Sequence, residues 1–234
     1  MFMIKYHGTP CSPMKIFYEA FANKNVLIPY PRPDDMQRAL QVCNKIIIDN
    51  GAFSVWRKGV AVDWSNFYNW MKKFIDRIEF FLIPDVINGT EIENNALLEI
   101  YEANKTEFKH KGVPIWHVNE SLERLEYLAE QYGYIAFGSA GQYAQLGTLA
   151  WHSKMNEAMR VACDNEGLPK VKIHMLRCLD PKLFTQYPFF SGDSTNVAVN
   201  HHRGGWQNIM KRIETADSPC KYAGGATQLN LWND

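Results

Sequence analysis

Lys45-Ile46-Ile47-Ile48-Asp49-Asn50-Gly51-Ala52-Phe53-Ser54 is the stretch that decides the fold. Its three consecutive isoleucines predict a strand buried on both faces, as in a parallel sheet. The strand leads straight into Asp49, and Asn-Gly after it is typical of a turn. Two other apolar runs, 80–85 and 188–193, also end in an aspartate. Because α/β folds place their chemistry at the carboxyl ends of strands, these three aspartates predict a functional site.

Predicted strands alternate with predicted helices along the whole chain. We expect strands at 1–6, 26–30, 45–49, 80–85, 113–117, 134–137, 171–175 and 189–191. We expect helices at 12–22, 33–43, 64–78, 90–108 and 121–133, then one ending at 161, a short one after 180–181, and one at 204–213. Eight such pairs predict a single compact (β/α)8 TIM barrel spanning residues 1–234. The alternative, an open doubly wound sheet, lacks its usual G-x-G-x-x-G turn after the first strand.

Composition limits the class of protein. The 234 residues carry 25 basic and 25 acidic side chains, so there is no global basic field to attract nucleic acid, although a local patch would suffice. Five cysteines without a CxxC pair favour a reducing, cytoplasmic compartment. No signal peptide or membrane-spanning run is evident. We expect no metal ion and no cofactor. A site of carboxylates and histidines lacks an H-x-H or HExxH spacing, and the most plausible zinc ligands, Cys178, Cys220, His201 and His202, also lack a metal-site spacing.

In a barrel, the strand ends converge on one mouth. Residues expected there are His7, Asp49, Asp85, His117, Gly138 with Ser139, His174 and Asp193. Paired carboxylates suit chemistry at a glycosidic bond, where one acts as nucleophile and the other moves protons. Burial after the three isoleucines is expected to raise the pKa of Asp49. A packing role is the alternative for Phe53, His117 and His174.

Several segments at strand ends resemble those of tRNA-guanine transglycosylases. Residues 49–54 resemble that family's DSGGFQ-type segment, 135–139 its base-binding strand end, and 172–176 its late strand with a histidine. Residues 192–196 stand where the family has its nucleophilic aspartate. The chain is most similar in style to the compact phage-type DNA-guanine transglycosylases (DpdA-like), with the resemblance covering residues 6–202.

The resemblance implies a pentosyltransferase that replaces guanine in nucleic acid with a 7-deazaguanine, such as 7-cyano-7-deazaguanine. Asp193 would form a covalent glycosyl intermediate, helped by space at Gly192 and hydrogen bonds from 194–196, and Asp49 would act as general acid–base. Asp85 would read the base, Phe53 would stack on it, and the backbone of Gly138 and Ser139 would meet its oxo edge. Asn50, His117, His174 and Asn196 complete the implied substrate-binding set.

One departure bears on the substrate. The family's CxCxxC zinc-binding insertion, which helps to hold tRNA, is missing, and this favours DNA over tRNA. We therefore expect Arg57, Lys58 and Arg203 to contact phosphates, in the cytoplasm of a host cell if the protein is phage-encoded. Two alternatives remain open. One is a nucleoside or N-glycoside hydrolase, and the other is a non-catalytic barrel subunit that binds nucleic acid.

Overall fold

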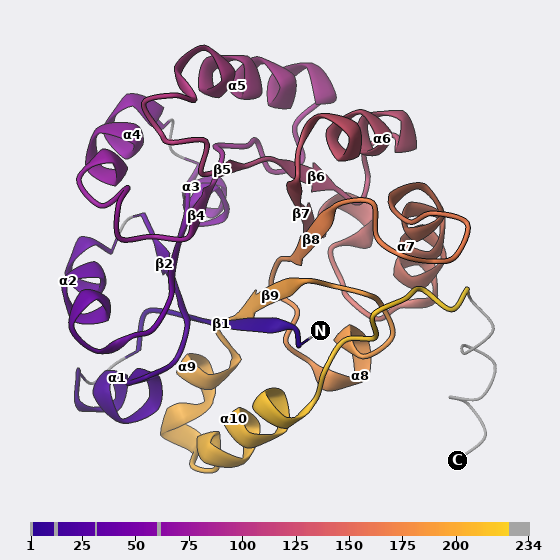
Figure 1. Cartoon of the computed structure of the whole chain (residues 1–234). Helices are drawn as coiled ribbons and strands as arrows, with labels where there is room; N and C mark the ends of the chain where they lie inside the picture. Colours follow the sequence, from indigo (N-terminus) through magenta and orange to yellow (C-terminus); the bar gives the residue numbers. More distant parts are fainter. Residues whose placement is uncertain (1, 12–13, 31, 60–61, 225–234) are drawn as a thin grey trace, which may run out of the picture.

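A computed structural model describes residues 2–11, 14–30, 32–59 and 62–224, which form a ring of parallel strands surrounded by helices (Figure 1). The strands are β1 (Ile4–Gly8), β2 (Val26–Pro29), β3 (Ile46–Asp49), β4 (Phe80–Leu82), β5 (Gly112–Val113), β6 (Ile115–His117), β7 (Tyr134–Gly138), β8 (Lys172–Met175) and β9 (Ser191–Ser194). One sheet contains all nine, in the order β5-β4-β3-β2-β1-β9-β8-β7-β6. The predicted TIM barrel is confirmed.

The ring closes at Pro114. The predicted fifth strand, 113–117, is present as β5 and β6 on either side of this proline. Proline has no N–H to donate to a ladder, so the strand is interrupted there. β5 pairs with β4 and β6 pairs with β7, while the Pro114 carbonyl still accepts from the amide of Ala136. The nine short strands therefore occupy eight strand positions around the barrel, because β5 and β6 share one position.

Most of the helices cover the outside of the ring, whereas the helix at residues 52–58 lies against the end of the ring, within the circle of outer helices (Figure 1). The helices are α1 (Met14–Phe21), α2 (Pro33–Val42), α3 (Ala52–Lys58), α4 (Trp64–Lys72), α5 (Glu91–Asn104), α6 (Leu122–Gln131), α7 (Leu149–Ala162), α8 (Pro181–Phe184), α9 (Asn196–Asn200) and α10 (Trp206–Thr215), with 3-10 turns η1 (Gly141–Tyr143) and η2 (His201–Arg203). Asp63 caps α4, Thr90 and Glu93 form a capping box on α5, and Ser121 caps α6. Side-chain caps thus fix the helix starts that the sequence predicts.

Local differences have local causes. The helix α3 was not predicted, because its N-cap is Gly51, which has φ 81° and no side chain of its own; the Ala52 N–H donates to the Asn50 side chain instead. The helix predicted at 90–108 ends as α5 at Asn104, and the last predicted strand lies later in the chain, as β9. Asp193 therefore lies inside a strand rather than after one. The predicted helix start at Ser12-Pro13 lies outside the described residues.

Alternation along the strands divides the core in two. Ile47 faces the barrel interior, together with Tyr6, Leu27, Phe80 and Ile115. Ile46 and Ile48 face outward and pack under the helices. The same period of two points Asp49, two residues after Ile47, into the interior at its carboxyl end. No helix among the described residues is long and apolar enough to cross a membrane.

Candidate functional site

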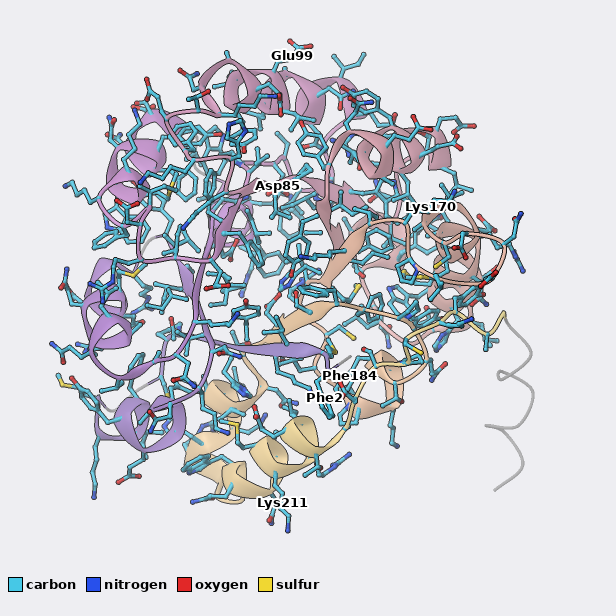
Figure 2. All side chains as sticks on the ribbon, in the orientation of Figure 1. Phe2, Asp85, Glu99, Lys170, Phe184 and Lys211 are labelled. Carbon is cyan, nitrogen blue, oxygen red and sulfur yellow. The ribbon has the colours of Figure 1, made fainter. Side chains whose placement is uncertain are left out.

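Carboxylates from three strand ends meet in one small pocket at the carboxyl mouth. The cavity has a volume of about 70 Å³. It is lined by Leu27, Asp49, Asn50, Ala52, Phe53, Asp85, Ile87, Ile115, His117, Gly138, Ser139, Leu176, Arg177 and Asp193. Asp85 lies toward the centre of the ring when the molecule is viewed along the barrel (Figure 2). The structure therefore brings together most of the residues that the sequence predicts for the mouth.

Asp49 is the carboxylate without an ion-pair partner among the described residues. Its Oδ1 accepts a hydrogen bond from the Gly51 N–H, with the two atoms 3.2 Å apart. Burial raises the pKa of Asp49 from 3.8 to about 7, against the opposing Gly51 hydrogen bond, and the nearby Asp193 and Asp85 carboxylates raise it further. The expected rise is confirmed. Near neutral pH, Asp49 can both donate and accept a proton.

Asp85 is held by two partners. Its Oδ1 accepts from the Asn50 amide at 2.8 Å, and its Oδ2 lies 2.9 Å from Nε2 of His117. Burial lowers the pKa of His117, but hydrogen bonds to Asp85 and Glu120 outweigh it and raise this pKa to about 9. His117 is therefore an imidazolium at neutral pH, forming a buried ion pair with Asp85.

Glu120 supports His117 from behind. Its Oε2 accepts from the His117 backbone N–H at 2.8 Å and from Nη1 of Arg124 at 2.7 Å. Its Oε1 accepts from the amide of Asn94, whose side chain also reaches the His117 ring. The network is nearly fully hydrogen-bonded, as a buried set of charges must be. Glu120, Arg124 and Asn94 were not predicted from the sequence, because they lie on or beside outer helices without a motif of their own.

Asp193 belongs to a series of hydrogen-bonded side chains that crosses the barrel interior. Its Oδ1 lies 3.1 Å from Nε2 of His174, and Nδ1 of His174 lies 2.5 Å from the hydroxyl of Ser191. Ser191 in turn lies 2.5 Å from the hydroxyl of Tyr134, at the first residue of β7. The series therefore runs from the carboxyl mouth toward the amino end of the barrel. It fixes the orientation of the His174 ring.

Arg177 closes one side of the mouth. Its guanidinium lies over the Phe53 ring, 4.8 Å from the centroid, and its Nη2 donates to the carbonyl of Ser139. Its backbone N–H donates to Asp193 at 3.2 Å. The hydroxyl of Ser139 accepts from the indole of Trp151. Arg177, with φ 57°, was not predicted from the sequence; its position two residues past the end of β8 was the available signal.

Two expectations about the surroundings of Asp193 are wrong. Residues 194–196 do not hold its carboxylate, because the Ser194 hydroxyl instead accepts from the backbone of Asn196. Gly192 leaves no space for a ligand: a Cβ there would lie 2.7 Å from the Met3 side chain and 3.0 Å from the Met175 carbonyl. Glycine is needed at this position because the neighbouring backbone approaches closely.

Other predicted residues lie away from the pocket. His7 faces the helices, where its Nε2 binds Glu214 on α10. The Asn196 side chain accepts from Asn200 within α9. Arg57 is exposed on α3, and the side chains of Lys58 and Arg203 lie outside what the structure describes. Phosphate contacts by these basic residues stay a prediction.

Metal ligands do not cluster in the part of the chain that the structure describes. No group of three His, Cys, Asp or Glu side chains there could hold a metal ion. The donors at the mouth are instead engaged in imidazole–carboxylate pairs.

Comparison with solved structures places the chain among TIM barrels. A protein of Aquifex aeolicus VF5 from a structural study superposes with a TM-score of 0.53 at 10% identity, covering 91% of this chain and 90% of that one. Two variants of the tryptophan synthase alpha-subunit from Pyrococcus furiosus have TM-scores of 0.52 and 0.51 at 12% and 11% identity, covering 92% and 91% of this chain and 98% and 97% of theirs. At these identities the likeness shows the fold alone. No family model and no curated protein matches the sequence.

The resemblance to guanine transglycosylases is therefore wrong, and with it the predicted base-exchange function. The structural neighbours are barrels of the tryptophan synthase alpha-subunit type, and no sequence comparison supports a transglycosylase. The quoted segments are short and lie where any (β/α)8 barrel needs turns and polar strand ends.

Proposed function

We propose that this protein is an enzyme that transfers protons to and from a small polar substrate, with Asp49 as general acid–base. The observation that carries the proposal is the division of roles among three carboxylates in one pocket. Asp85 and Asp193 are each paired with an imidazole, whereas Asp49 is unpaired among the described residues and titrates at about pH 7. A carboxyl group whose pKa lies near the working pH is suited to act as general acid and general base.

The lining suggests the kind of substrate. Carboxylates of Asp49, Asp85 and Asp193 favour a group that donates hydrogen bonds through N–H or O–H. Leu27, Ile115 and Leu176 form an apolar wall that fits a carbon skeleton. The small volume suits a compact metabolite, or one end of a larger one whose remainder extends toward the exposed Arg177. An anionic group at that remote end would form an ion pair with the guanidinium of Arg177.

The two paired aspartates have supporting roles in this proposal. Asp193 is anchored by His174 and by the Arg177 backbone, so it presents a fixed negative charge to positive charge that develops on the substrate. Asp85 is held in place by His117 and Asn50, so its carboxylate can accept a hydrogen bond from the substrate in a fixed orientation. Asn50 fixes Asp85, since its amide also donates to the carbonyl of Ile83.

Solvent-proton exchange tests the proposal without a known product. The protein is incubated in D₂O with a panel of small amino, hydroxy and oxo acids and nitrogen heterocycles, and loss of carbon-bound proton signals is followed by NMR. We expect at least one compound to exchange or react, and Asp49→Asn to slow it by about 10²–10⁴-fold. The rate should depend on a group with a pKa of about 7.

Asp63→Asn is the matched control, because it makes the same chemical change at an exposed helix cap. It should leave the exchange unchanged. Full activity in Asp49→Asn would remove Asp49 from the proposed role. Inertness of the wild-type protein toward the whole panel would contradict proton transfer on small metabolites.

A further inference from the structure

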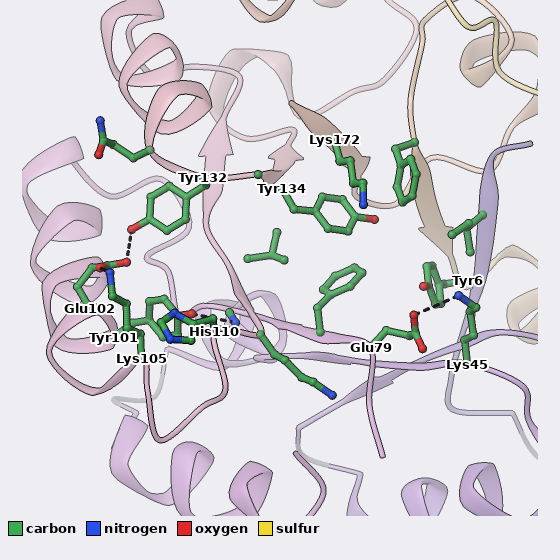
Figure 3. Close-up of a pocket in the computed structure, with 18 of the residues that line it drawn as sticks. Tyr6, Lys45, Glu79, Tyr101, Glu102, Lys105, His110, Tyr132, Tyr134 and Lys172 are labelled. Atoms are coloured by element: carbon green, nitrogen blue, oxygen red, sulfur yellow. Dashed lines mark hydrogen bonds and ion pairs between the residues drawn. The ribbon is translucent and has the colours of Figure 1, made fainter. Parts of the chain in front are cut away.

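A second cavity lies at the opposite, amino-terminal end of the barrel (Figure 3). Its volume is about 760 Å³, and its lining includes the first residues of five strands: Ile4, Phe80, Gly112, Tyr134 and Lys172. It shares no lining residue with the pocket at the carboxyl mouth. Residues at this end of a (β/α)8 barrel ordinarily serve stability, yet this volume falls in the range of ligand sites.

The cavity carries an excess of positive charge. Four lysines line it, and only two of them have carboxylate partners: Lys45 pairs with Glu79, and Lys105 pairs with Glu102. Among the described residues, Lys111 and Lys172 have no carboxylate within ion-pair distance. Lys111 donates to the carbonyls of Ile75 and Ile78. Asp76 also interacts electrostatically with Lys111, which leaves Lys172 as the lysine best placed to hold an anion in this cavity.

Aromatic rings form the wall next to Lys172. The Phe80 and Tyr134 rings lie 4.9 Å apart, and the Tyr134 and Phe190 rings lie 5.5 Å apart. The Lys172 ammonium lies 4.7 Å from the Phe190 centroid, and both Phe190 and Tyr134 are partly exposed. Figure 3 shows Lys172 and Tyr134 beside each other at the same edge of the cavity. Such ring faces bind another planar ring, while the ammonium binds its charged substituent.

We propose that this cavity binds an anionic ligand that carries a planar ring, with Lys172 holding the anionic group and Tyr134 and Phe190 contacting the ring. Phosphate and carboxylate share this chemistry, so the ligand is either a nucleotide-like phosphate ester or an aromatic carboxylate. Tyr134 also begins the hydrogen-bonded chain through Ser191 and His174 to Asp193. A ligand against Tyr134 thus contacts the same chain that orients the carboxyl mouth.

Calorimetric titration with four probes tests the site. Adenosine 5′-monophosphate and 2-naphthoate represent the two sources, inorganic phosphate lacks the ring, and adenosine lacks the charge. We expect saturable one-to-one binding of at least one ring-bearing anion and at least tenfold weaker binding of phosphate and adenosine. Which of the two anions binds identifies the source.

Variants locate the binding. Lys172→Gln should weaken the ring-bearing anion at least tenfold, and Lys172→Arg should restore most of the affinity. Lys211→Gln is the control, because Lys211 is an exposed lysine on the outer helix α10 (Figure 2). Asp49→Asn should bind normally, which separates this cavity from the carboxyl mouth. Absence of saturable binding by both anions, or equal affinity in Lys172→Gln, would overturn the proposal.

Discussion

Replacing Asp49 by asparagine should stabilise the protein in a pH-dependent way. Burial raises the pKa of Asp49 to about 7 in the folded chain, while an aspartate in an unfolded chain titrates near pH 3.9. Below about pH 4 the carboxyl is protonated in both states. Between about pH 4 and 7 the unfolded chain releases this proton and the folded chain retains it, so stability falls as the pH rises. Above pH 7 the loss is complete.

The size of the effect follows from the shift. A difference of about three pKa units corresponds to about 4 kcal/mol of unfolding free energy. Asparagine has nearly the same shape, carries no charge at any pH, and can still accept from the Gly51 N–H. The unfolding free energy of Asp49→Asn minus that of the wild type should therefore grow by about 1.4 kcal/mol per pH unit up to about pH 7, then stay constant. At about pH 8 this corresponds to a Tm roughly 10 °C higher.

Urea unfolding at constant ionic strength, at each of several pH values from about 5 to 8, measures this difference. Other titrating groups are common to both proteins and cancel. Asp63→Asn serves as control, since hydrogen bonds from Ser65 hold the pKa of Asp63 below its usual range and leave it ionised throughout. A difference that does not change with pH, or that levels off near pH 4 to 5, would mean that the folded chain does not hold Asp49 protonated.

Two further substitutions test the networks that flank Asp49. Glu120→Gln should lower the pKa of His117 from about 9, and it should lower the free energy of unfolding by about 3–5 kcal/mol because Arg124 is left buried without its carboxylate. NMR titration of His117 and urea unfolding measure the two effects, with Glu79→Gln, in an exposed ion pair, as the control; an unchanged His117 pKa would contradict the network. Ser191→Ala should remove the hydrogen-bond partner of both Tyr134 and His174 and lower the free energy of unfolding by about 1–3 kcal/mol. Tyr134→Phe removes only one of these bonds and should have a smaller effect. Equal stability of the wild type and Ser191→Ala would show that the series of hydrogen bonds across the barrel does not form.

Short motifs misled the functional interpretation for a physical reason. A parallel strand that ends at a barrel mouth needs a turn, and Asp, Asn and Gly are the residues that form one. Asp49-Asn50-Gly51 meets that need whatever the reaction: the Asn50 side chain caps the turn by accepting from the Ala52 N–H, and Gly51 takes a positive φ. Segments of this kind therefore recur at strand ends of unrelated barrels, and their order along the chain follows from the fold.

Sequence alone determined the barrel and the inward direction of several site residues. Apolar runs alternating with capped helices specify the eight βα units, and the period of two along β3 points Asp49 inward because Ile47 does so. These are local properties of the chain, since strand period, turn residues and helix caps each depend on a few neighbouring residues.

Only the tertiary structure decided which carboxylate is free to titrate. Asp85 meets His117 from 32 residues away, and Asp193 meets His174 from 19 residues away, while Asp49 is left with a backbone hydrogen bond. Such pairings depend on which strands lie next to each other and on how much water the closed ring excludes. The curvature of the whole sheet likewise decides three other features: the position of Arg177, the closure at Pro114 and the charged cavity at the amino end. Each depends on residues whose distance from one another is set only when the barrel closes.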